Sequence, residues 1–370
     1  TPIKSSAASD VYKRQIMHNV NILTIHKEPN YGAVLQAYAL YKTIENLGHV
    51  PYIINLDMDY SRFPYSLKYR VLLGLHKWMK GYSHCFALAE RFSRKHCPNQ
   101  IGNFHTTAEL ESYPWNKDDY YLIGSDQVWN PGITQNLRTA FCFSFLKNDV
   151  KNRYAYAASF GNIKDEERRK SELDMKALSL FKRIAVREKF GVEFLQRNGI
   201  DAVEVIDPTL LLESYRDLLP HKVEERNEIL FLSLSDTAEM NAFAKGLSVK
   251  TGLPIRKHYG YLQPERKKNM EFLPIEEWLY AIASAKVVIT DSFHATVFSM
   301  LFGKPFYVYI SEPSKVFRIS NLLDILGIKR RIVNDVDDAI AAPSINYETV
   351  NQRLSAYRES SLNYLKSILA

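Results

Sequence analysis

The sequence is organised around the segment from Lys286 to Phe306, KVVITDSFHATVFSMLFGKPF. Its first six residues, 286–291, are a short β-branched apolar run bounded by polar residues, which is typical of a buried strand in a parallel sheet. From Ala295 the apolar residues follow helical spacing, and Gly303 and Pro305 supply the stop signals of a helix. The segment therefore predicts a strand, a polar turn and a short helix.

The polar turn of this segment holds the first candidate site. Asp291, Ser292 and His294 fall at the carboxyl end of the strand, beside the unpaired N–H groups of a helix start. In open α/β sheets ligands bind at this edge, and anions find ready donors there. A lone histidine is usually structural, but a histidine on such a turn has both exposure and polar neighbours. We therefore predict a functional role for His294.

Chain length and composition set the class of protein. The chain has 370 residues, which is too long for one ordinary core, so we expect two domains. No apolar run approaches the roughly 20 residues that cross a bilayer, and the N-terminus lacks the apolar core of a signal peptide. The three cysteines, Cys85, Cys97 and Cys142, form no disulfide framework. We therefore expect a soluble protein of the reducing cytoplasm.

The net charge of +7 is moderate. Residues 1–16 show no helical or strand period, and we expect them to be a leader or an artefact, disordered and outside the fold. They hold three basic residues and one acidic residue, so the charge without them is +5. This basicity favours anionic small substrates or a membrane surface. No nucleic-acid motif accompanies it, and we expect no nucleic-acid partner.

Two histidine–cysteine doublets, His84–Cys85 and His96–Cys97, are the best metal candidates in the sequence. Structural zinc sites usually separate paired ligands by two to four residues, and adjacent ligands on a helix diverge by about 100°. We therefore expect no metal site and interpret the doublets as ordinary side chains of a helical region.

A strand–helix–strand pattern opens the chain at residues 19–56, with a Rossmann-like rhythm. It lacks the Gly-x-Gly-x-x-Gly motif, so a dinucleotide ligand is not expected. The turn between the first strand and the helix carries Asn30, Tyr31 and Gly32. These residues are either a helix cap or a ligand contact, and both alternatives stay open.

The segment 61–102 is rich in basic residues interleaved with aromatic ones. A basic helix with an aromatic face can lie on an anionic membrane. The alternative is a solvated face above a stripe that packs on the core. We therefore interpret it as a basic helical insertion with two possible roles.

Polar residues follow two further predicted strands, at 119–124 and 154–161. The first strand is followed by Ser125, Asp126, Gln127 and Trp129, and the second breaks at Ser159. An indole beside amides and carboxylates suits sugar binding, because the ring stacks on C–H groups while the polar groups hold hydroxyls. Trp129 is equally compatible with a core anchor.

Arg187 ends another predicted strand, and Glu188 opens the helix that follows. A guanidinium at this position can hold a phosphate bidentately. The alternative is a salt bridge on the following helix.

The second half of the chain repeats the α/β alternation. We place the domain border at the turn Asp207–Thr209, which divides the fold into an N-terminal domain, 17–206, and a C-terminal domain, 207–345, followed by a helix in 346–370. Two such units with polar residues at their strand ends predict a binding cleft between them.

Six motifs in order resemble the polysaccharide pyruvyl transferase family. They are NYGAVLQAYAL (30–40), GSDQVWN (124–130), ASFG (158–161), VREKFG (186–191), DPT (207–209) and TDSFHA (290–295). The match runs from about Asn19 to Ile310. The set in this order is specific, although each piece alone is weak.

The resemblance implies two Rossmann-like domains facing a cleft, as in GT-B glycosyltransferases, with the C-terminal helix returning to the first domain. It implies transfer of pyruvate from phosphoenolpyruvate to sugar hydroxyls as a ketal, with release of phosphate, in the biosynthesis of cell-surface polysaccharides (exopolysaccharides). Phosphoenolpyruvate is then a co-substrate, and no other cofactor is expected. The acceptor is a sugar or a lipid-linked oligosaccharide. For a lipid-linked acceptor, the segment 61–102 is the expected contact with the inner face of the membrane.

By position, His294 resembles the family's proposed general acid/base, and Arg187 resembles a phosphate-binding arginine. Some members carry Arg-Leu before the histidine, where this chain has Ser292–Phe293, and Lys304 is a candidate replacement for the missing charge. The acceptor side of the cleft would use the other polar residues at strand ends: Asn30, Tyr31, Gly32, Ser125, Asp126, Gln127, Trp129, Ser159 and Asp291.

Two other functions stay open. A GT-B glycosyltransferase that uses a nucleotide sugar would have the same architecture, because a fold does not determine a function. The missing arginine also leaves room for a non-catalytic glycan-binding homologue.

Overall fold

The computed structural model describes residues 17–58, 82–161, 173–259, 273–310 and 313–370. The predicted leader, 1–16, lies outside the described residues, as does the first half of the basic insertion, 61–81.

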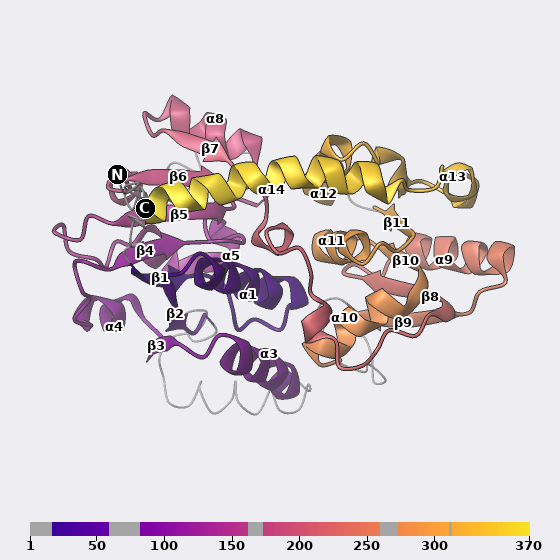
Figure 1. Ribbon diagram of the computed structural model, residues 1–370, viewed down its shortest axis with the longest axis horizontal. Helices are drawn as coiled ribbons and strands as arrows, with labels where there is room; N and C mark the ends of the chain where they lie inside the picture. Colours follow the sequence, from indigo (N-terminus) through magenta and orange to yellow (C-terminus); the bar gives the residue numbers. More distant parts are fainter. Residues whose placement is uncertain (1–16, 59–81, 162–172, 260–272, 311–312) are drawn as a thin grey trace, which may run out of the picture.

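The first domain is built on a sheet of seven parallel strands in the order β3-β2-β1-β4-β5-β6-β7 (Figure 1). The strands are β1 (Asn19–Leu23), β2 (Val50–Leu56), β3 (Gln100–Phe104), β4 (Tyr120–Ile123), β5 (Arg153–Ala158), β6 (Arg183–Val186) and β7 (Ala202–Glu204). The central strands are almost fully buried, because helices cover the sheet on both faces.

The second domain has five parallel strands in the order β12-β11-β10-β8-β9. They are β8 (Arg226–Ser233), β9 (Ile255–Tyr259), β10 (Ala285–Thr290), β11 (Phe306–Tyr309) and β12 (Ile332–Val333). The strand predicted in the focal segment is β10, at the centre of this sheet.

The helices of the first domain are α1 (Tyr31–Asn46), α3 (Tyr82–His96), α4 (Thr107–Ser112), α5 (Pro131–Thr134), α7 (Met175–Leu178) and α8 (Lys189–Arg197). Those after the first sheet are α9 (Ala238–Thr251), α10 (Ile275–Ser284), α11 (Phe293–Leu301), α12 (Pro313–Ile325), α13 (Val336–Ala341) and α14 (Tyr347–Leu369). Short 3-10 turns are η2 (Gln135–Leu137), η3 (Ala140–Cys142), η4 (Pro208–Leu210), η5 (Arg216–Leu218) and η6 (Lys329–Arg331).

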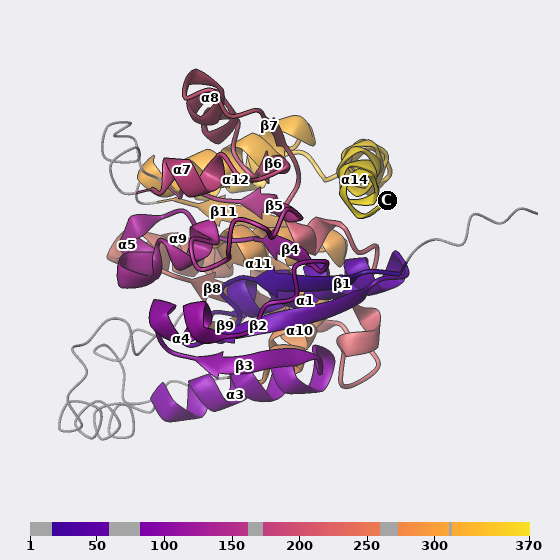
Figure 2. The same ribbon diagram turned by 90° about the vertical axis from the view of Figure 1, so that its left-hand side faces the viewer.

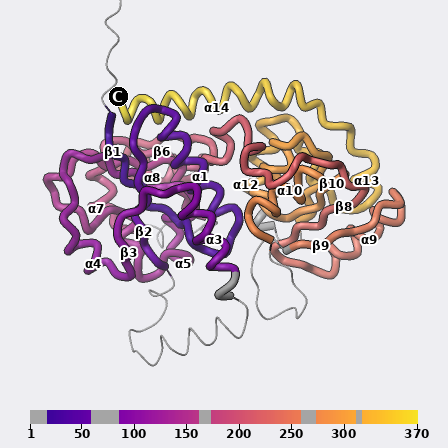
Figure 3. Tube along the Cα trace, turned by 60° about the horizontal axis from the view of Figure 1, so that its bottom comes forward, coloured from indigo at the N-terminus to yellow at the C-terminus, as the bar shows by residue number. Residues whose placement is uncertain are grey.

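The C-terminal helix α14 lies along both domains and ends on the first one (Figures 1 and 3). The hydroxyl of Tyr364 donates to the carbonyl of Ala155 at 3.1 Å, and Ser361 accepts from the amide of Ile206 at 3.1 Å. Leu365 is buried in the same apolar cluster as strands β1 and β4. The predicted architecture is confirmed: two α/β domains, each built on a parallel sheet, with a C-terminal helix that returns to the first domain.

A shared apolar cluster holds the two domains together. It joins Leu35 of α1 and Phe92 of α3 to Trp278 of α10 and Phe298 of α11, all of them buried. Because α1 and α11 each begin at the carboxyl end of a strand, their contact brings the polar turns of the two sheets close together.

The basic insertion differs from the prediction in one respect. Its last residues form the edge strand β3, and α3 lies beside that edge (Figure 2). Cys85, Ala89 and Phe92 of α3 are at most 5% exposed, so this part of the insertion packs on the core, as the second alternative proposed. Among the described helices, none combines the length and apolar character needed to cross a bilayer.

Candidate active site

The turn after β10 uses two of the predicted site residues to build itself. The carboxylate of Asp291 accepts from the amides of Leu234 at 2.6 Å and Ser235 at 3.0 Å, which fastens the loop after β8. Ser292 is the N-cap of α11, and its hydroxyl accepts from the amide of Ala295 at 3.4 Å. Both side chains are therefore engaged in local structure.

His294, in the first turn of α11, lies against α1. A Cβ atom on Gly32 would fall 1.9 Å from Nδ1 of His294, so only a glycine leaves room for the imidazole there. On the other side of the ring, Nε2 lies 3.7 Å from Oδ2 of Asp207. Nε2 is shielded from solvent and makes no hydrogen bond with any residue that the structure describes.

Asp207 contacts both Arg187 after β6 and His294 of α11. Its Oδ1 accepts from the amide of Thr209 at 3.0 Å and from the Thr209 hydroxyl at 2.6 Å, and its Oδ2 accepts from Nη1 of Arg187 at 2.6 Å. Burial alone would raise the pKa of Asp207, but the contacts with His294 and Arg187 outweigh burial and hold the pKa well below its ordinary value. Asp207 therefore stays ionised between an imidazole and a guanidinium.

Arg187, at the end of β6, is surrounded by carboxylates. Besides Asp207, its Nε lies 3.6 Å from Glu188 and its Nη2 lies 3.7 Å from Asp126. Burial opposes the charged form, but these three carboxylates raise the pKa of Arg187 above its ordinary value. The salt bridge with Glu188 that we gave as the alternative is present. Nε and Nη2 have no hydrogen-bond partner in the described part of the chain.

Glu188 and Ser159 form a buried pair beside Arg187. The hydroxyl of Ser159 donates to Oε1 of Glu188 and accepts from the amide of Gly161 at 3.1 Å. Burial raises the pKa of Glu188, although the charge of Arg187 and the hydrogen bond from Ser159 oppose the shift. Ser159 thus supports the Arg187 turn from within the first domain.

Two guanidinium groups lie over the ring of Phe293, the residue before His294. Arg187 is 5.5 Å and Arg318 of α12 is 5.8 Å from the ring centroid. Both arginines line a cavity of about 140 Å³ between the end of β7 and α12, together with Asp207 and Phe293. The cavity receives side chains from both domains.

The turn before α1 is used for structure. Oδ1 of Asn30 accepts from the amides of Gly32 at 2.9 Å and Ala33 at 3.3 Å, so Asn30 is the helix cap. Tyr31 stacks on Trp278 of the second domain with ring centroids 4.8 Å apart. Its hydroxyl donates to the carbonyl of Leu273 at 2.8 Å. Tyr31 therefore joins the two domains.

The residues after β4 are engaged inside the first domain. Ser125 is fully buried and donates to the carbonyl of Ala157 at 2.9 Å. Gln127 accepts from the side chain of Asn130 at 2.7 Å. Of the four residues predicted after β4, Asp126 contacts Arg187, at 3.7 Å.

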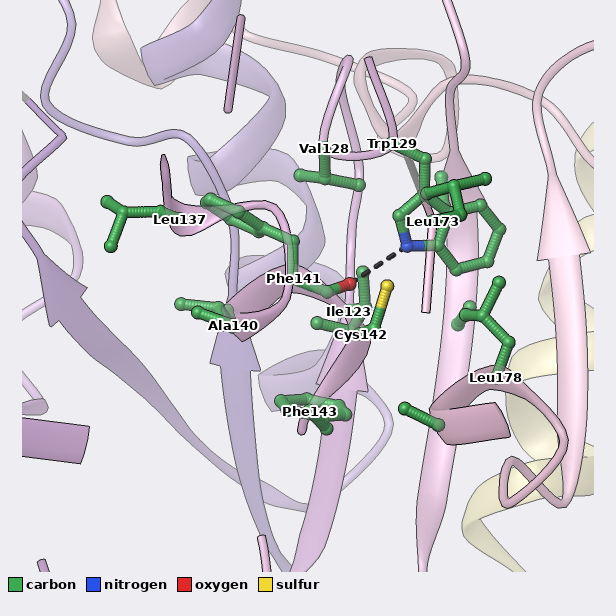
Figure 4. Packing of buried hydrophobic residues seen from close by; sticks show 14 of the residues in the cluster. Ile123, Val128, Trp129, Leu137, Ala140, Phe141, Cys142, Phe143, Leu173 and Leu178 are labelled. Atoms are coloured by element: carbon green, nitrogen blue, oxygen red, sulfur yellow. Dashed lines mark hydrogen bonds between the residues drawn. The ribbon is translucent and has the colours of Figure 1, made fainter. Parts of the chain in front are cut away.

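Trp129 lies in the hydrophobic core (Figure 4). Its side chain is 0% exposed, and Nε1 donates to the carbonyl of Phe141 at 2.8 Å. The core-anchor alternative is therefore the one that the structure shows, because a fully covered indole offers no face to a sugar.

Lys304 is not brought to the site. It follows the C-terminal end of α11, and nine helical residues rise about 13 Å from the turn that holds His294. Its ammonium lies 3.6 Å from Glu225. The structure therefore does not bring Lys304 beside His294, because α11 separates the two residues.

Three residues of the cluster were missed by sequence reasoning. Asp207 was interpreted as a domain border, although its Asp-Pro-Thr motif was part of the family resemblance. Glu188 was considered only as a salt-bridge partner. Arg318 lies in an ordinary helical pattern, and no local signal distinguishes it from other arginines.

Solved structures place the fold in a known class. S. aureus MnaA in complex with UDP is 12% identical, with a TM-score of 0.54 over 95% of this chain and 96% of that one. Arabidopsis thaliana UGT89C1 with UDP-L-rhamnose is 13% identical, with a TM-score of 0.51 over 96% and 99% of the two chains. An α-glucosyltransferase in complex with UDP and DNA is 10% identical, with a TM-score of 0.51 over 96% and 100%. At these identities the likeness shows the fold alone, which is the GT-B type.

The family follows from the sequence. The model of the polysaccharide pyruvyl transferase family matches residues 30–313, which is most of the chain. The chain belongs to the polysaccharide pyruvyl transferase family, as the motifs predicted. No curated protein sequence matches it.

Proposed function

We propose that the protein transfers pyruvate from phosphoenolpyruvate to a pair of hydroxyls on a sugar acceptor. The observation that supports this proposal best is the meeting of His294 and Arg187, from opposite domains, on one carboxylate oxygen of Asp207. A proton-transfer group from the second domain and a buried cation from the first domain thereby lie side by side.

The reaction balances without a further co-reactant. A proton adds to the methylene carbon of phosphoenolpyruvate, and one sugar hydroxyl oxygen bonds to C2 and loses its own proton. The bond between C2 and the phosphate oxygen then breaks, and phosphate leaves with its electron pair. The second hydroxyl bonds to C2 and releases its proton, which yields the cyclic ketal.

His294 moves a proton in this scheme. Because Nε2 faces Asp207, the nitrogen on the Gly32 side, Nδ1, exchanges the proton with the substrate. The ionised Asp207 faces the ring and orients it, as a carboxylate does for a catalytic histidine.

Arg187 has a narrower role than the sequence predicted. Three carboxylates already compensate its charge, and its unsatisfied Nε and Nη2 atoms are the donors left for a ligand. We propose that Arg187 holds Asp207 in place and offers these N–H groups to the donor.

The acceptor is proposed to be a sugar unit of a cell-surface polysaccharide, free or lipid-linked. This proposal rests on family membership. Cytoplasmic location, and contact with the membrane through 61–102, stay predictions.

One experiment tests the proposed reaction. The protein is incubated with phosphoenolpyruvate and a mixture of glycan acceptors, and mass spectrometry follows the acceptors. We expect a sugar that gains the mass of pyruvate less water, together with equimolar phosphate. Phosphate release without a pyruvylated sugar, or no consumption of phosphoenolpyruvate with any acceptor, would contradict the proposal.

The nucleotide-sugar alternative is separated by donor binding. We expect phosphoenolpyruvate to raise the melting temperature and a panel of UDP, GDP and CMP sugars to leave it unchanged, because only a bound ligand stabilises the folded state. The reverse pattern would favour a glycosyltransferase.

A further inference from the structure

The returning helix α14 contacts the chain on both sides of Asp207. Ahead of the aspartate, the amide of Ile206 donates to the hydroxyl of Ser361 at 3.1 Å. Beyond it, the carbonyl of Leu210 accepts from Nε of Arg358 at 2.8 Å. The backbone on either side of Asp207 is therefore fixed to one helix.

The carboxylate of Asp207 is in its turn fixed to this segment, 206–210, which we call the Asp207 turn. Oδ1 accepts from both the amide and the hydroxyl of Thr209, so the side chain follows the backbone of the turn. Oδ2 faces Nη1 of Arg187 at 2.6 Å and Nε2 of His294 at 3.7 Å. The direction of Oδ2 consequently depends on the backbone that α14 holds.

Helix α14 is packed on both domains. Near its start, Val350 and Leu354 are buried in the apolar cluster that the two domains share. Near its end, Tyr364 and Leu365 are buried in the first domain (Figure 3). The side chains that contact the Asp207 turn come from the part of the helix between these two sets. The helix therefore positions the turn relative to both domains.

The place of Arg358 on α14 indicates a specific role. Leu354, Ser361 and Leu365 are buried on one face of the helix, and helical spacing puts Arg358 on the same face. An apolar residue is the ordinary occupant of such a face, and burial lowers the pKa of the half-buried Arg358. The hydrogen bond to Leu210 is what an arginine adds at this position.

We propose that Arg358 is a positioning residue of the active site, which holds the Asp207 turn so that the carboxylate faces His294. Arg358 acts through Asp207 and not on the substrate. The inference rests on the proposed function in naming the reaction that this geometry serves. The geometry itself can be followed without substrate.

The test uses variants of the full-length protein. Arg358→Met keeps a long side chain but removes the donor, and Arg353→Met is the matched control on an exposed arginine of the same helix. We expect Arg358→Met to lower kcat by roughly ten-fold to a hundred-fold and to change the KM for phosphoenolpyruvate less than about two-fold, because a displaced catalytic group lowers the rate more than substrate affinity. Arg353→Met should match the wild type. Arg358→Lys retains a cationic donor and should recover part of the loss.

A double-variant cycle distinguishes positioning from general structural support. In the Asp207→Asn background, Arg358→Met should lower kcat no further, because the carboxylate that it positions is already absent. Losses that multiply in the double variant would overturn the proposal, as would equal kcat values for Arg358→Met and Arg353→Met. Ser361→Ala removes the contact ahead of Asp207 and should show the same pattern, so the cycle can be measured where Arg358→Met does not fold.

The ring resonances of His294 supply a readout that needs no substrate. They are followed by NMR with isotope-labelled histidine and assigned with His294→Ala. We expect these resonances to shift in Arg358→Met in the same direction as in Asp207→Asn, and to keep their positions in Arg353→Met. Unchanged resonances in Arg358→Met would overturn the proposal. If the resonances shift while no sugar gains pyruvate, the positioning role stands and the proposed function fails.

Discussion

The turn after β6 and the turn after β10 occupy equivalent places at the carboxyl ends of the two sheets, yet they use their polar residues differently. After β6, Arg187 is enclosed by Asp126, Glu188 and Asp207, so its charge is compensated within the protein. After β10, Asp291 and Ser292 build the turn, and the His294 ring keeps a nitrogen without a hydrogen bond. At both strand ends, most polar side chains are therefore paired within the protein, and few polar atoms remain to contact a ligand.

Asp207→Asn should have the largest effect, because Asp207 serves both turns. The change removes one carboxylate from buried Arg187 and the anion that faces His294. We expect a loss of about 3 kcal/mol in the free energy of unfolding, near the low end for a broken buried ion pair because Glu188 and Asp126 remain. Urea denaturation measures this, with exposed Asp149→Asn as the control, which should change stability little.

The pH dependence of stability sharpens this prediction. The pKa of Asp207 in the folded state lies below the ordinary value of 3.8, so its ionised form stabilises the fold at pH values above about 4. This contribution is lost as the pH falls below that value. We expect the wild type to lose stability more steeply than Asp207→Asn between about pH 4 and pH 2. If the free energy of unfolding fell equally with pH in the two proteins, Asp207 would make no pH-dependent contribution to stability.

His294→Ala should lower kcat strongly and change the stability of the fold little. Removal of a general acid/base typically lowers the rate by roughly two orders of magnitude or more, and the ring makes no hydrogen bond that folding would lose within the described structure. We expect kcat to fall accordingly while the melting temperature changes by only a few degrees. Near-full activity in this variant would remove His294 from the mechanism.

Gly32→Ala tests the close approach of the two domains. The new Cβ would lie 1.9 Å from Nδ1 of His294, so the imidazole must move. We expect a cost of about 1–3 kcal/mol in stability from overpacking, together with a loss of kcat. Gly132→Ala is the control, since its Cβ would meet only Asn130 at 3.3 Å. Equal kcat values for the two variants would contradict the placement of the imidazole.

Ser292→Ala should have the smallest effect. Its hydroxyl caps α11, and the loss of such a cap costs about 1 kcal/mol of stability. We expect the KM for phosphoenolpyruvate to stay within about two-fold, because the hydroxyl is already used as an acceptor. A larger rise in KM with unchanged stability would indicate that Ser292 contacts the donor.

Much of the fold was predictable from local pattern. The strand–helix–strand pattern predicted at 19–56 is present as β1, α1 and β2, and the strand that opens the 286–306 segment is β10, because buried parallel strands are continuous apolar runs and helices carry clear stop signals. The edge strands β3 and β12 were missed because they are short and partly exposed, which removes the apolar pattern.

The candidate site was predicted less completely. Arg187 and His294 were singled out because they lie at strand ends, and the structure brings both to Asp207. Trp129 was left open between a sugar contact and a core anchor, and Lys304 was expected beside His294, because a sequence does not show which face of a turn is covered or how far a helix carries a side chain from its start. Arg318 carried no local signal, because its place over the distant Phe293 ring depends on tertiary packing.

By itself, the sequence determined the fold class, the family and the two turns that hold Arg187 and His294, because these depend on local periodicity and on motifs in a particular order. Only the tertiary structure decided which of those side chains remain available. The packing of α1 against α11 places His294 beside Asp207, and the position of α12 places a second guanidinium over Phe293. Charge compensation acts over a few ångströms in space, so residues far apart in the chain determine it.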